Sequence, residues 1–539
     1  MLVLQKADLK NKQKWTDAGI ELPAFDIDSV FDATKKAPVW IHFGAGNIFR
    51  CFIADLQQRL LNANLAQTGL IAVAPYDYDI IERIYKPFDN LTLQAIMNPD
   101  GTLTKKVIAS VTEALPGDSA NKTAWGRLCN IFTAPSLQMV SFTITEKGYS
   151  LRGIDGSLTK TAQADIQNGP AKPVHTMSII TALLYERYKK NKLPLALVSM
   201  DNCSRNGETL QKSVCEIADT WIKNGFADTG FMDYLIDEQK ITFPWTMIDK
   251  ITPRPAASVQ NKLEALGITN LEPIITSHNT YIAPFVNAEP AQYLVIEDKF
   301  PAGRPAFEKL KNAGVYLTDR QTVNRVEKMK VTTCLNPLHT ALAVYGCLLG
   351  YTSIAEEMKN PYLTKLIKHI GYDEGLPVVT DPQILKPVDF IDEVITRRLP
   401  NPNIPDTPQR IATDTSQKIP VRYGETIKSY ITLNKPMDSF VGIPLAIAGW
   451  FRYLLAVDDM GNKMELSPDP MLQDLQNALA GVKPGEPDTA KGVLPPLLKN
   501  RTLFGTDLTQ TVLAQKIESY FIELTAGNGA VTKTLEKYV

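Results

Sequence analysis

Long apolar stretches are absent from this sequence, and so is any strong excess of charge. No apolar run reaches the roughly 20 residues needed to cross a bilayer, and residues 1–15 turn polar too early for a signal peptide. The 57 basic and 58 acidic residues give a net charge of −1. This balance offers no electrostatic attraction to nucleic acid or to an anionic membrane, so we expect neither as a partner.

Cysteine and histidine are also scarce, with six and five residues among 539. The cysteines are scattered, and the sequence contains neither a Cys-x-x-Cys pair nor a His/Cys cluster. A disulfide scaffold and a structural zinc site are therefore not expected, and a reducing cytoplasm suits the chain. The remaining composition, 44% hydrophobic and 21% charged, is typical of a globular protein, and the length predicts two large domains.

Strand and helix patterns alternate in the first 300 residues. Helices are predicted over residues 48–62 and 176–191 from their apolar spacing. Buried strands are predicted within residues 39–47, 70–77, 139–149 and 195–202. This alternation is typical of an α/β fold with a doubly wound, mostly parallel sheet.

The pattern becomes helical after about residue 300. Helices are predicted in residues 331–358, 360–375, 390–399 and 443–456, with loops at 399–408 and 481–496. The Pro/Gly-rich segment 300–310 marks the expected boundary. We therefore expect an α/β domain of residues 1–300 and a mainly helical domain of residues 301–539.

The sequence GAGNIF follows the first predicted strand and opens a helix. Gly44 allows a tight turn, and Gly46 lets the backbone approach a phosphate bound at the helix N-terminus. Phe49 replaces the third glycine of the dinucleotide fingerprint, so a purely structural turn is the alternative. We predict a dinucleotide site formed by Gly44, Ala45, Gly46, Asn47 and Ile48.

An acidic residue after the second strand usually binds the ribose hydroxyls of a dinucleotide. Asp77 is the best placed candidate, with Asp79 next, although both lie further from Gly46 than is usual. A carboxylate there would repel a 2′-phosphate, so NAD is favoured over NADP. The alternative is a solvated turn at residues 75–79.

Lys330, Asn336 and His339 lie close together in the otherwise apolar, Thr-rich stretch KVTTCLNPLHT. A free lysine, with a pKa of roughly 10.4, is a poor base at neutral pH. A role for Lys330 in proton transfer therefore requires burial, which lowers the pKa of an amine. If the stretch is helical, Asn336 and His339 lie one turn apart on the same side.

Seven segments in sequence resemble the polyol-specific long-chain dehydrogenase/reductase family, which includes the mannitol dehydrogenases. They are residues 42–54, 143–149, 199–207, 246–253, 292–300, 330–339 and 410–422. The resemblance implies a Rossmann-type N-terminal domain, a mainly α-helical C-terminal domain and an active site between them. It also implies hydride transfer with a nicotinamide cofactor and without a metal ion.

The resemblance also implies roles for individual residues. Lys330 would be the general acid/base, with Glu327 relaying its proton to water, although Lys330 stands one residue further from Asn336 than in the family pattern. The amides of Asn202 and Asn336 would stabilise the developing alkoxide, and His339 would bind a substrate hydroxyl. The alternatives are an Asx turn at Asn202, a helix cap at Asn336, a structural His339 and a solvated Glu327.

Three further residues resemble members of the family's substrate pocket: Asp249, Arg410 and Lys418. Lys250 follows Asp249 where the family usually has arginine, which has a different hydrogen-bond geometry. The alternative for Arg410 and Lys418 is that they cap helices or pair with Asp414.

The substrate is expected to be a small sugar acid or polyol. Residues 75–93 and 334–343 most resemble the D-mannonate oxidoreductase (fructuronate reductase) branch, and cations in the pocket suit a uronate carboxylate. The alternatives are a mannitol 2-dehydrogenase or tagaturonate reductase, and a catalytically idle NAD-binding protein. A monomer or a small homo-oligomer is expected.

Overall fold

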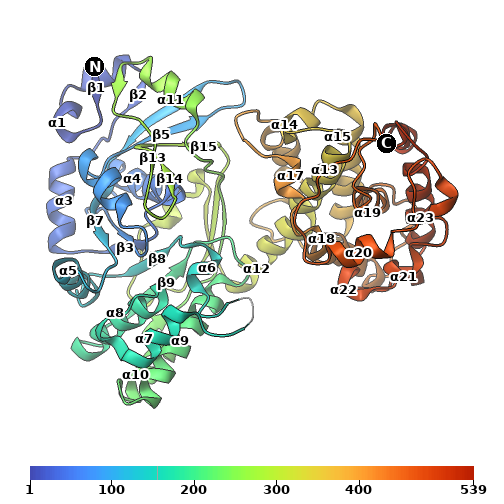
Figure 1. The fold of residues 1–539 in the computed structure, drawn as a ribbon. Helices are drawn as coiled ribbons and strands as arrows, with labels where there is room; N and C mark the ends of the chain where they lie inside the picture. Colours follow the sequence, from blue (N-terminus) through green and yellow to red (C-terminus); the bar gives the residue numbers. More distant parts are fainter. Residues whose placement is uncertain (154–155) are drawn as a thin grey trace. The chain divides into compact units, whose positions relative to one another are not determined.

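The computed structural model describes residues 1–153 and 156–539. They form two compact units, residues 1–324 and 325–539, and each is described by itself (Figure 1). The units divide about twenty residues after the expected boundary because the strand β17 (Val315–Thr318) pairs with β16 (Tyr293–Glu297) in the first unit.

The first unit contains a six-stranded parallel sheet in the order β10-β9-β8-β3-β4-β7. Its strands are β3 (Trp40–Phe43), β4 (Leu70–Ala74), β7 (Val111–Pro116), β8 (Met139–Phe142), β9 (Leu195–Ser199) and β10 (Ile241–Thr242). The chain starts at β3, builds outward through β4 and β7, and then returns to β8 on the other side. This is the doubly wound order of a Rossmann-type fold, so the predicted fold class is confirmed.

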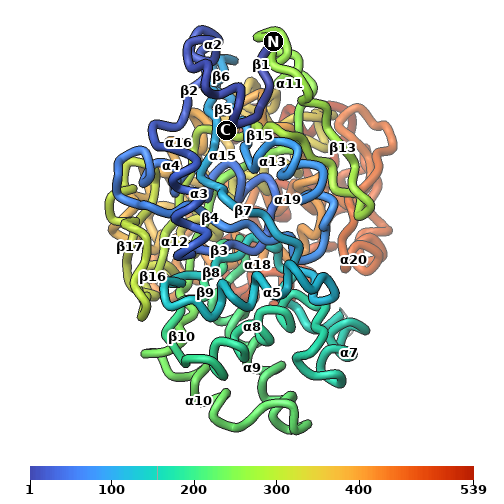
Figure 2. Tube along the Cα trace, turned by 90° about the vertical axis from the view of Figure 1, so that its left-hand side faces the viewer, coloured from blue at the N-terminus to red at the C-terminus, as the bar shows by residue number. Residues whose placement is uncertain are grey.

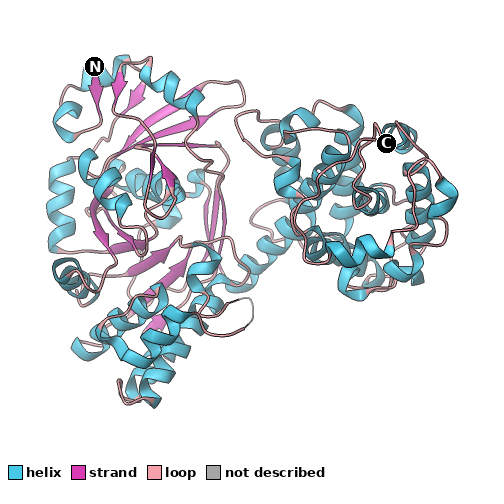
Figure 3. Cartoon of the chain, viewed as in Figure 1, coloured by secondary structure: helices cyan, strands magenta, loops and turns pink. Residues whose placement is uncertain are grey.

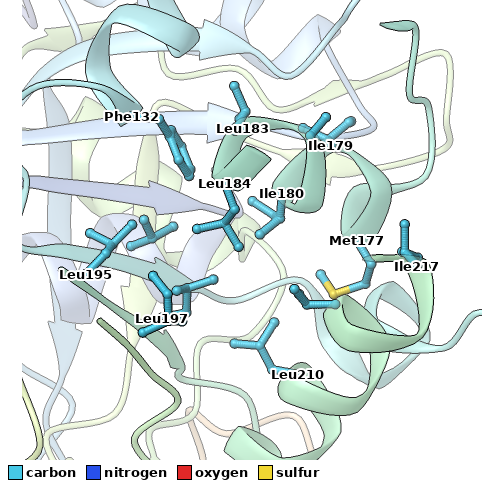
Figure 4. Packing of buried hydrophobic residues seen from close by; sticks show 14 of the residues in the cluster. Phe132, Met177, Ile179, Ile180, Leu183, Leu184, Leu195, Leu197, Leu210 and Ile217 are labelled. Carbon is cyan, nitrogen blue, oxygen red and sulfur yellow. The ribbon is translucent and has the colours of Figure 1, made fainter. Parts of the chain in front are cut away.

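Both faces of this sheet are buried, because alternate residues enter two different cores. On β3, Ile41 and Phe43 belong to one cluster, whereas Trp40 belongs to the other. Figure 4 shows the first cluster, where Leu195 and Leu197 of β9 face the helices. The helices that pack there include α5 (Lys122–Phe132), α8 (Thr176–Lys190) and α9 (Asn206–Lys223).

The predicted strand over 139–149 is wrong in its second half. The strand β8 ends at Phe142, and a short helix, α6 (Thr145–Tyr149), follows. The physical reason is Asp201, whose carboxylate accepts the backbone N–H groups of Ile144 and Thr145 and the Tyr149 hydroxyl. These bonds turn the chain away from the sheet.

Four smaller sheets complete the part of the first unit that the structure describes, and the sequence patterns did not predict them. Figure 2 shows one of them at the N-terminus, where β1 lies near α11 (Ala257–Glu264) and pairs with β12. The first pairs β1 (Leu2–Val3) with β12 (Ile268–Thr269), and the second contains β2 (Ile20–Glu21), β5 (Thr92–Met97), β6 (Leu103–Ile108) and β15 (Phe285–Ala288). The third joins β11 (Thr246–Asp249) with β16 and β17, and the fourth pairs β13 (Ile274–Ile275) with β14 (Tyr281–Ile282). The remaining α-helices are α1 (Lys6–Leu9), α2 (Lys12–Asp17), α3 (Ile27–Lys36), α4 (Ala54–Asn62), α7 (Lys160–Asn168) and α10 (Gly230–Ile236).

The second unit is helical, as predicted, and its described residues contain no strand (Figure 3). Its helices are α12 (Arg320–Met329), which enters from the first unit, α13 (Asn336–Leu348), α14 (Ile354–Glu357), α15 (Pro361–Lys368), α16 (Pro387–Glu393), α17 (Pro408–Ile411), α18 (Thr415–Thr432), α19 (Gly442–Tyr453), α20 (Leu472–Ala478), α21 (Pro495–Leu498), α22 (Arg501–Phe504), α23 (Leu513–Leu524) and α24 (Ala530–Tyr538). Every helix among the described residues is too short or too polar to cross a bilayer.

A buried carboxylate holds the start of α19, a helix that is buried over its whole length. Glu374 accepts the backbone N–H groups of Val441, Gly442 and Ile443, each at 2.6 Å. Burial raises the pKa of Glu374 to about 7, although the three donors oppose this shift. The carboxylate satisfies N–H groups that the helix itself cannot.

The side chain of Asn206 joins β9, α9 and β11. Its amide nitrogen donates to the carbonyl oxygens of Ser199 and Asp201 at 3.2 and 3.0 Å, and to Thr246 Oγ1 at 2.8 Å. Its amide oxygen accepts the backbone N–H of Thr246 at 3.0 Å. Removing this amide would leave several buried polar groups without a partner.

We therefore predict that Asn206→Ala lowers the unfolding free energy of the first unit by about 3 kcal/mol. Urea unfolding followed by tryptophan fluorescence measures this, because five of the six tryptophans lie in the first unit. Asn202→Ala is the control, since Asn202 is exposed and its loss should change stability little. Equal unfolding midpoints for the two variants would contradict the role of Asn206.

Candidate active site

The turn after β3 requires glycine at its first position. Gly44 has a φ of +117°, and a Cβ atom there would lie 2.1 Å from the carbonyl oxygen of Thr143. A Cβ at Gly46 would meet nothing within 4 Å, so the backbone there is open to a ligand. Both glycines therefore have the properties that a phosphate-binding turn needs.

Phe49 explains why the third glycine of the fingerprint is missing. Its ring is buried and stacks on the imidazole of His42, with ring centroids 4.3 Å apart. His42 contacts the hydroxyls of Ser141 and Thr143, and burial lowers the pKa of His42 to about 3. The helix begins as a π-helical segment, Phe49–Ile53, before α4. The third glycine normally lets the helix backbone pack closely against the strand. Here the stacked Phe49 ring fills that space instead.

A cavity of about 740 Å³ opens at the carboxyl ends of β3, β4 and β8. This is the point where the strand order reverses, and dinucleotides bind at such points in doubly wound folds. The residues that line it include Gly44, Ala45, Tyr76, Asp77, Thr145 and Thr280. Thr145 has a φ of +65°, a backbone conformation that is rare for a β-branched residue.

Asp77 lies in this cavity with one oxygen atom available. Its Oδ2 atom accepts a hydrogen bond from Thr276 Oγ1 at 2.6 Å. Its Oδ1 atom is buried and has no hydrogen-bond partner among the described residues. An unpaired buried acceptor fits the hydroxyl group of a ribose, which can donate to it.

Asn47 and Ala45 are held by other side chains of the first unit. The amide oxygen of Asn47 accepts from Arg50 Nη2 at 2.8 Å, and the Ala45 carbonyl accepts from the Tyr85 hydroxyl. Arg50 is fully buried, donates to the carbonyl of Ala283, and has its pKa lowered by burial to about 10. Ile48 is half-buried. These residues shape the turn through packing and backbone contacts.

Asn202 and Asp249 follow strands of the first unit but differ in exposure. Asn202 is exposed and follows Asp201, whose pKa is raised by burial. Asp249 is buried at the end of β11. Beside it, Lys250 donates to the backbone carbonyl of Glu289, while the Glu289 carboxylate accepts the N–H of Ile251.

Lys330 begins a π-helical segment, Lys330–Cys334, between α12 and α13. Its side chain is buried, with 5% of the residue exposed. The N–H of Leu335 donates to the Lys330 carbonyl at 3.2 Å, the five-residue spacing of a π turn. Such a turn holds one residue more than an α-turn and is frequent at functional sites, which accounts for the additional residue before Asn336. Glu327 is half-buried in the last turn of α12.

Asn336 and His339 lie on the first turn of α13, with Pro337 between them. The carbonyl oxygen of Asn336 accepts from Thr340 Oγ1 at 2.9 Å and from Arg422 Nη1 at 3.2 Å. Arg422 also donates to the Thr340 hydroxyl, and burial lowers the pKa of Arg422 to about 10. Arg422 ends the segment 410–422 and is one of the cations expected from the sequence to suit a uronate carboxylate.

His339 is a neutral imidazole with an unused ring nitrogen. Its Nε2 atom is buried and has no hydrogen-bond partner among the described residues. The Oδ2 atom of Asp406 lies 3.6 Å away. Burial lowers the pKa of His339 to about 4, and three nearby cations, Arg422, Arg410 and Arg398, act in the same direction. At neutral pH the Nε2 atom can therefore donate a hydrogen bond to a ligand or accept one from it, depending on the tautomer of the ring.

Arg410 and Lys418 both have partners inside the second unit. Arg410 is exposed and pairs with Asp406, not with Asp414. Lys418 donates to the carbonyls of Ile411 and Thr413, just as α17 ends. Burial lowers the pKa of Lys418 to about 8, and the neighbouring Arg422 adds to the shift. Lys418 thus caps the C-terminal end of α17. The positive charges near His339 are those of Arg398, Arg410 and Arg422.

Metal ligands are not gathered anywhere in the described parts of the chain. Among residues 1–153 and 156–539, no group of three or more His, Cys, Asp or Glu side chains is placed to hold a metal ion.

Known proteins resemble this chain over its whole length. It is 50% identical over 538 residues to D-mannonate oxidoreductase of Thermotoga maritima, with 99% of both chains covered. It is 28% identical to mannitol 2-dehydrogenase of Aspergillus clavatus, which covers 97% of this chain and 100% of the relative.

Two solved structures share the fold. One is mannitol 2-dehydrogenase of Pseudomonas fluorescens in a ternary complex with NAD and D-mannitol, with a TM-score of 0.70 and 24% identity over 99% of both chains. The other is a substrate-free D-sorbitol dehydrogenase, with a TM-score of 0.79 and 24% identity over 100% of both chains.

Two family models account for most of the sequence. Residues 39–309 match the Rossmann domain of mannitol dehydrogenase, and residues 322–524 match its C-terminal domain. These matches follow the two units of the structure. The chain therefore belongs to the mannitol dehydrogenase family.

Proposed function

We propose that the protein catalyses NAD-dependent hydride transfer between D-fructuronate and D-mannonate. The observation that carries this proposal is the 50% identity to a D-mannonate oxidoreductase across 99% of both chains. The cations around His339 support an acidic substrate, because a uronate or aldonate brings a carboxylate. We also propose that the enzyme works in the cytoplasm as a monomer or small homo-oligomer.

The first unit would hold NAD at the turn after β3. Gly44 and Gly46 suit the pyrophosphate, and the unpaired Asp77 Oδ1 suits a ribose hydroxyl. When bound, NAD supplies the acceptor for the electrons released by the alcohol. The negative charge of Asp77 would repel a 2′-phosphate, so NAD is preferred to NADP. The NAD complex of the Pseudomonas protein supports NAD binding at this site.

Lys330 would move the proton. During oxidation its amine accepts the proton of the reacting hydroxyl, and during reduction it returns that proton. Glu327, one helical turn earlier, would pass this proton to water. The burial of Lys330 supports the role, because it shields the amine from bulk water.

Neutral groups would stabilise the oxygen atom as it becomes negative. The amides of Asn202 and Asn336 would donate to it, which lowers the barrier without a change in their own protonation. The Nε2 atom of His339 would contact a second substrate hydroxyl. Asp249 would accept a hydrogen bond from another, and Arg410 and Lys418 would attract the carboxylate.

The main alternative is another reaction of the same family, on mannitol or tagaturonate. The 28% identity to a mannitol 2-dehydrogenase motivates it. An idle NAD-binding protein is the other alternative, prompted by the additional residue before Asn336. The π turn at Lys330–Cys334 gives that residue a structural explanation and weakens this alternative.

A panel of alcohols tests the substrate. We expect NADH absorbance to rise with D-mannonate and far more slowly with altronate, mannitol and mannitol 1-phosphate, because only the correct epimer matches the hydroxyl contacts and the carboxylate partners. Turnover of mannitol without turnover of mannonate would overturn the substrate assignment and leave the oxidoreductase assignment intact.

Replacing the acid/base tests the mechanism. We predict that Lys330→Met lowers kcat by about a thousandfold or more, because the proposed mechanism has no other group that accepts the hydroxyl proton directly. NAD affinity, measured by quenching of protein fluorescence, should persist. Lys328→Met is the matched control, since Lys328 is exposed on the preceding turn. Equal losses in both variants, or none in Lys330→Met, would exclude Lys330 as the acid/base.

Lys418 predicts a pH dependence of substrate binding. The pKa of Lys418 is lowered to about 8, so the ammonium group is charged below this pH and loses its proton above it. The substrate carboxylate stays ionised throughout. We therefore expect the KM for mannonate to rise between pH 7 and pH 9, and to rise less in Lys418→Arg, whose guanidinium keeps its charge. An identical KM profile in the variant would remove Lys418 from carboxylate binding.

A further inference from the structure

A hairpin far along the sequence reaches the loop that follows β4. The strands β13 and β14 form this hairpin, residues 274–282. Thr276 Oγ1 donates to Asp77 Oδ2 at 2.6 Å across 199 positions of sequence. The N–H of Ser277 donates to Asp79 Oδ2 at 2.8 Å, and Arg83 Nη1 donates to the Ile275 carbonyl at 3.0 Å. Three hydrogen bonds thus join the hairpin to residues 77–83.

The hydrogen bond between Thr276 and Asp77 has a defined direction. The hydroxyl of Thr276 accepts the backbone N–H of Thr280 at 3.0 Å, so its own proton is left to point at the Asp77 carboxylate. Thr276 is buried, and the Oδ1 atom of Asp77 has no hydrogen-bond partner in the part of the chain that the structure describes. One carboxylate oxygen is therefore held by the hairpin, and the other retains its capacity to accept a hydrogen bond.

The hairpin also adds an aromatic surface beside Asp77. The rings of Tyr76 and His278 lie with centroids 4.1 Å apart and a tilt of 50°. Tyr76 is 68% exposed, although it lines the same cavity as Asp77 and Thr280. An exposed aromatic ring next to a hydroxyl-binding carboxylate offers a flat base a surface for stacking.

We propose that the hairpin 274–282 recognises the adenosine half of the dinucleotide. Thr276 is a positioning residue that orients Asp77 toward the ribose, and Tyr76 with His278 forms the surface on which adenine stacks. The inference rests on the proposed NAD site at Gly44 and Asp77. The hairpin adds a third segment to that site, beside the glycine-rich turn after β3 and the acidic residue after β4.

Fragments of the cofactor test this proposal. Adenosine monophosphate carries only the half that the hairpin would contact, and nicotinamide mononucleotide carries only the other half. In Thr276→Val, which keeps the shape but removes the donor, we expect the KM for NAD and the dissociation constant for adenosine monophosphate, measured by quenching of protein fluorescence, to rise about tenfold. The rate at saturating NAD and the inhibition by nicotinamide mononucleotide should stay within about twofold.

Three further variants complete the experiment. Thr276→Ser should restore both constants, because it restores the hydroxyl donor. Tyr76→Ala should weaken adenosine monophosphate and NAD but not nicotinamide mononucleotide, and its exposed position keeps the test valid if Thr276→Val folds poorly. Ile275→Thr is the control, since this side chain is 62% exposed on the same hairpin and should leave every constant unchanged.

The outcomes separate this proposal from the NAD site on which it rests. If Asp77→Ala raises the KM for NAD while Thr276→Val and Tyr76→Ala do not, the hairpin proposal is overturned and the NAD site stands. If Thr276→Val weakens both fragments equally, the hairpin is only structural. If Asp77→Ala also leaves NAD binding intact, the NAD site itself is wrong.

Discussion

The close approach of two backbones, at Gly44 and Thr143, is the constraint on which the nucleotide half of the molecule depends. A side chain at Gly44 would overlap the Thr143 carbonyl, so β3 and β8 can end side by side only because this residue has none. Asp201 then turns the chain after β8 away from the sheet by accepting the N–H groups of Ile144 and Thr145. Together these contacts leave the cavity at the point where the strand order reverses.

In the helical unit the corresponding constraint is desolvated charge. The half-buried guanidinium of Arg422 contacts the first turn of α13, and it acts with Arg398 and Arg410 to keep His339 neutral. Lys418 is held by carbonyls at the end of α17 and has an unusually low pKa. Partly buried charges are costly without a partner, and a ligand carboxylate would be one such partner.

Much of the fold could be predicted because its signals are local. Short apolar runs predicted the central strands, and the glycines at 44 and 46 predicted the turn between β3 and its helix. Asp77 could be singled out as an acid after a strand. The helical C-terminal half followed from its apolar spacing alone.

What could not be predicted depends on partners that are distant in sequence. The end of β8 is decided by Asp201, and the orientation of Asp77 by Thr276, 199 positions later. The partner of Arg410 is Asp406 rather than Asp414, a choice that only the path of the loop before α17 decides. The role of Phe49 was also hidden, because its packing partner His42 lies on the other side of the turn.

The π turn at Lys330–Cys334 shows that the number of residues between the lysine and α13 can differ among proteins of the family. One residue of a helix corresponds to about 100° of rotation about its axis. Adding or losing a single residue here therefore reorients the whole of α13 relative to the lysine, whereas exchanging a side chain leaves both directions as they were. The number of residues in this segment thus sets the direction in which the side chains of α13 point relative to the lysine. Two relatives with identical residues can therefore hold them at different angles.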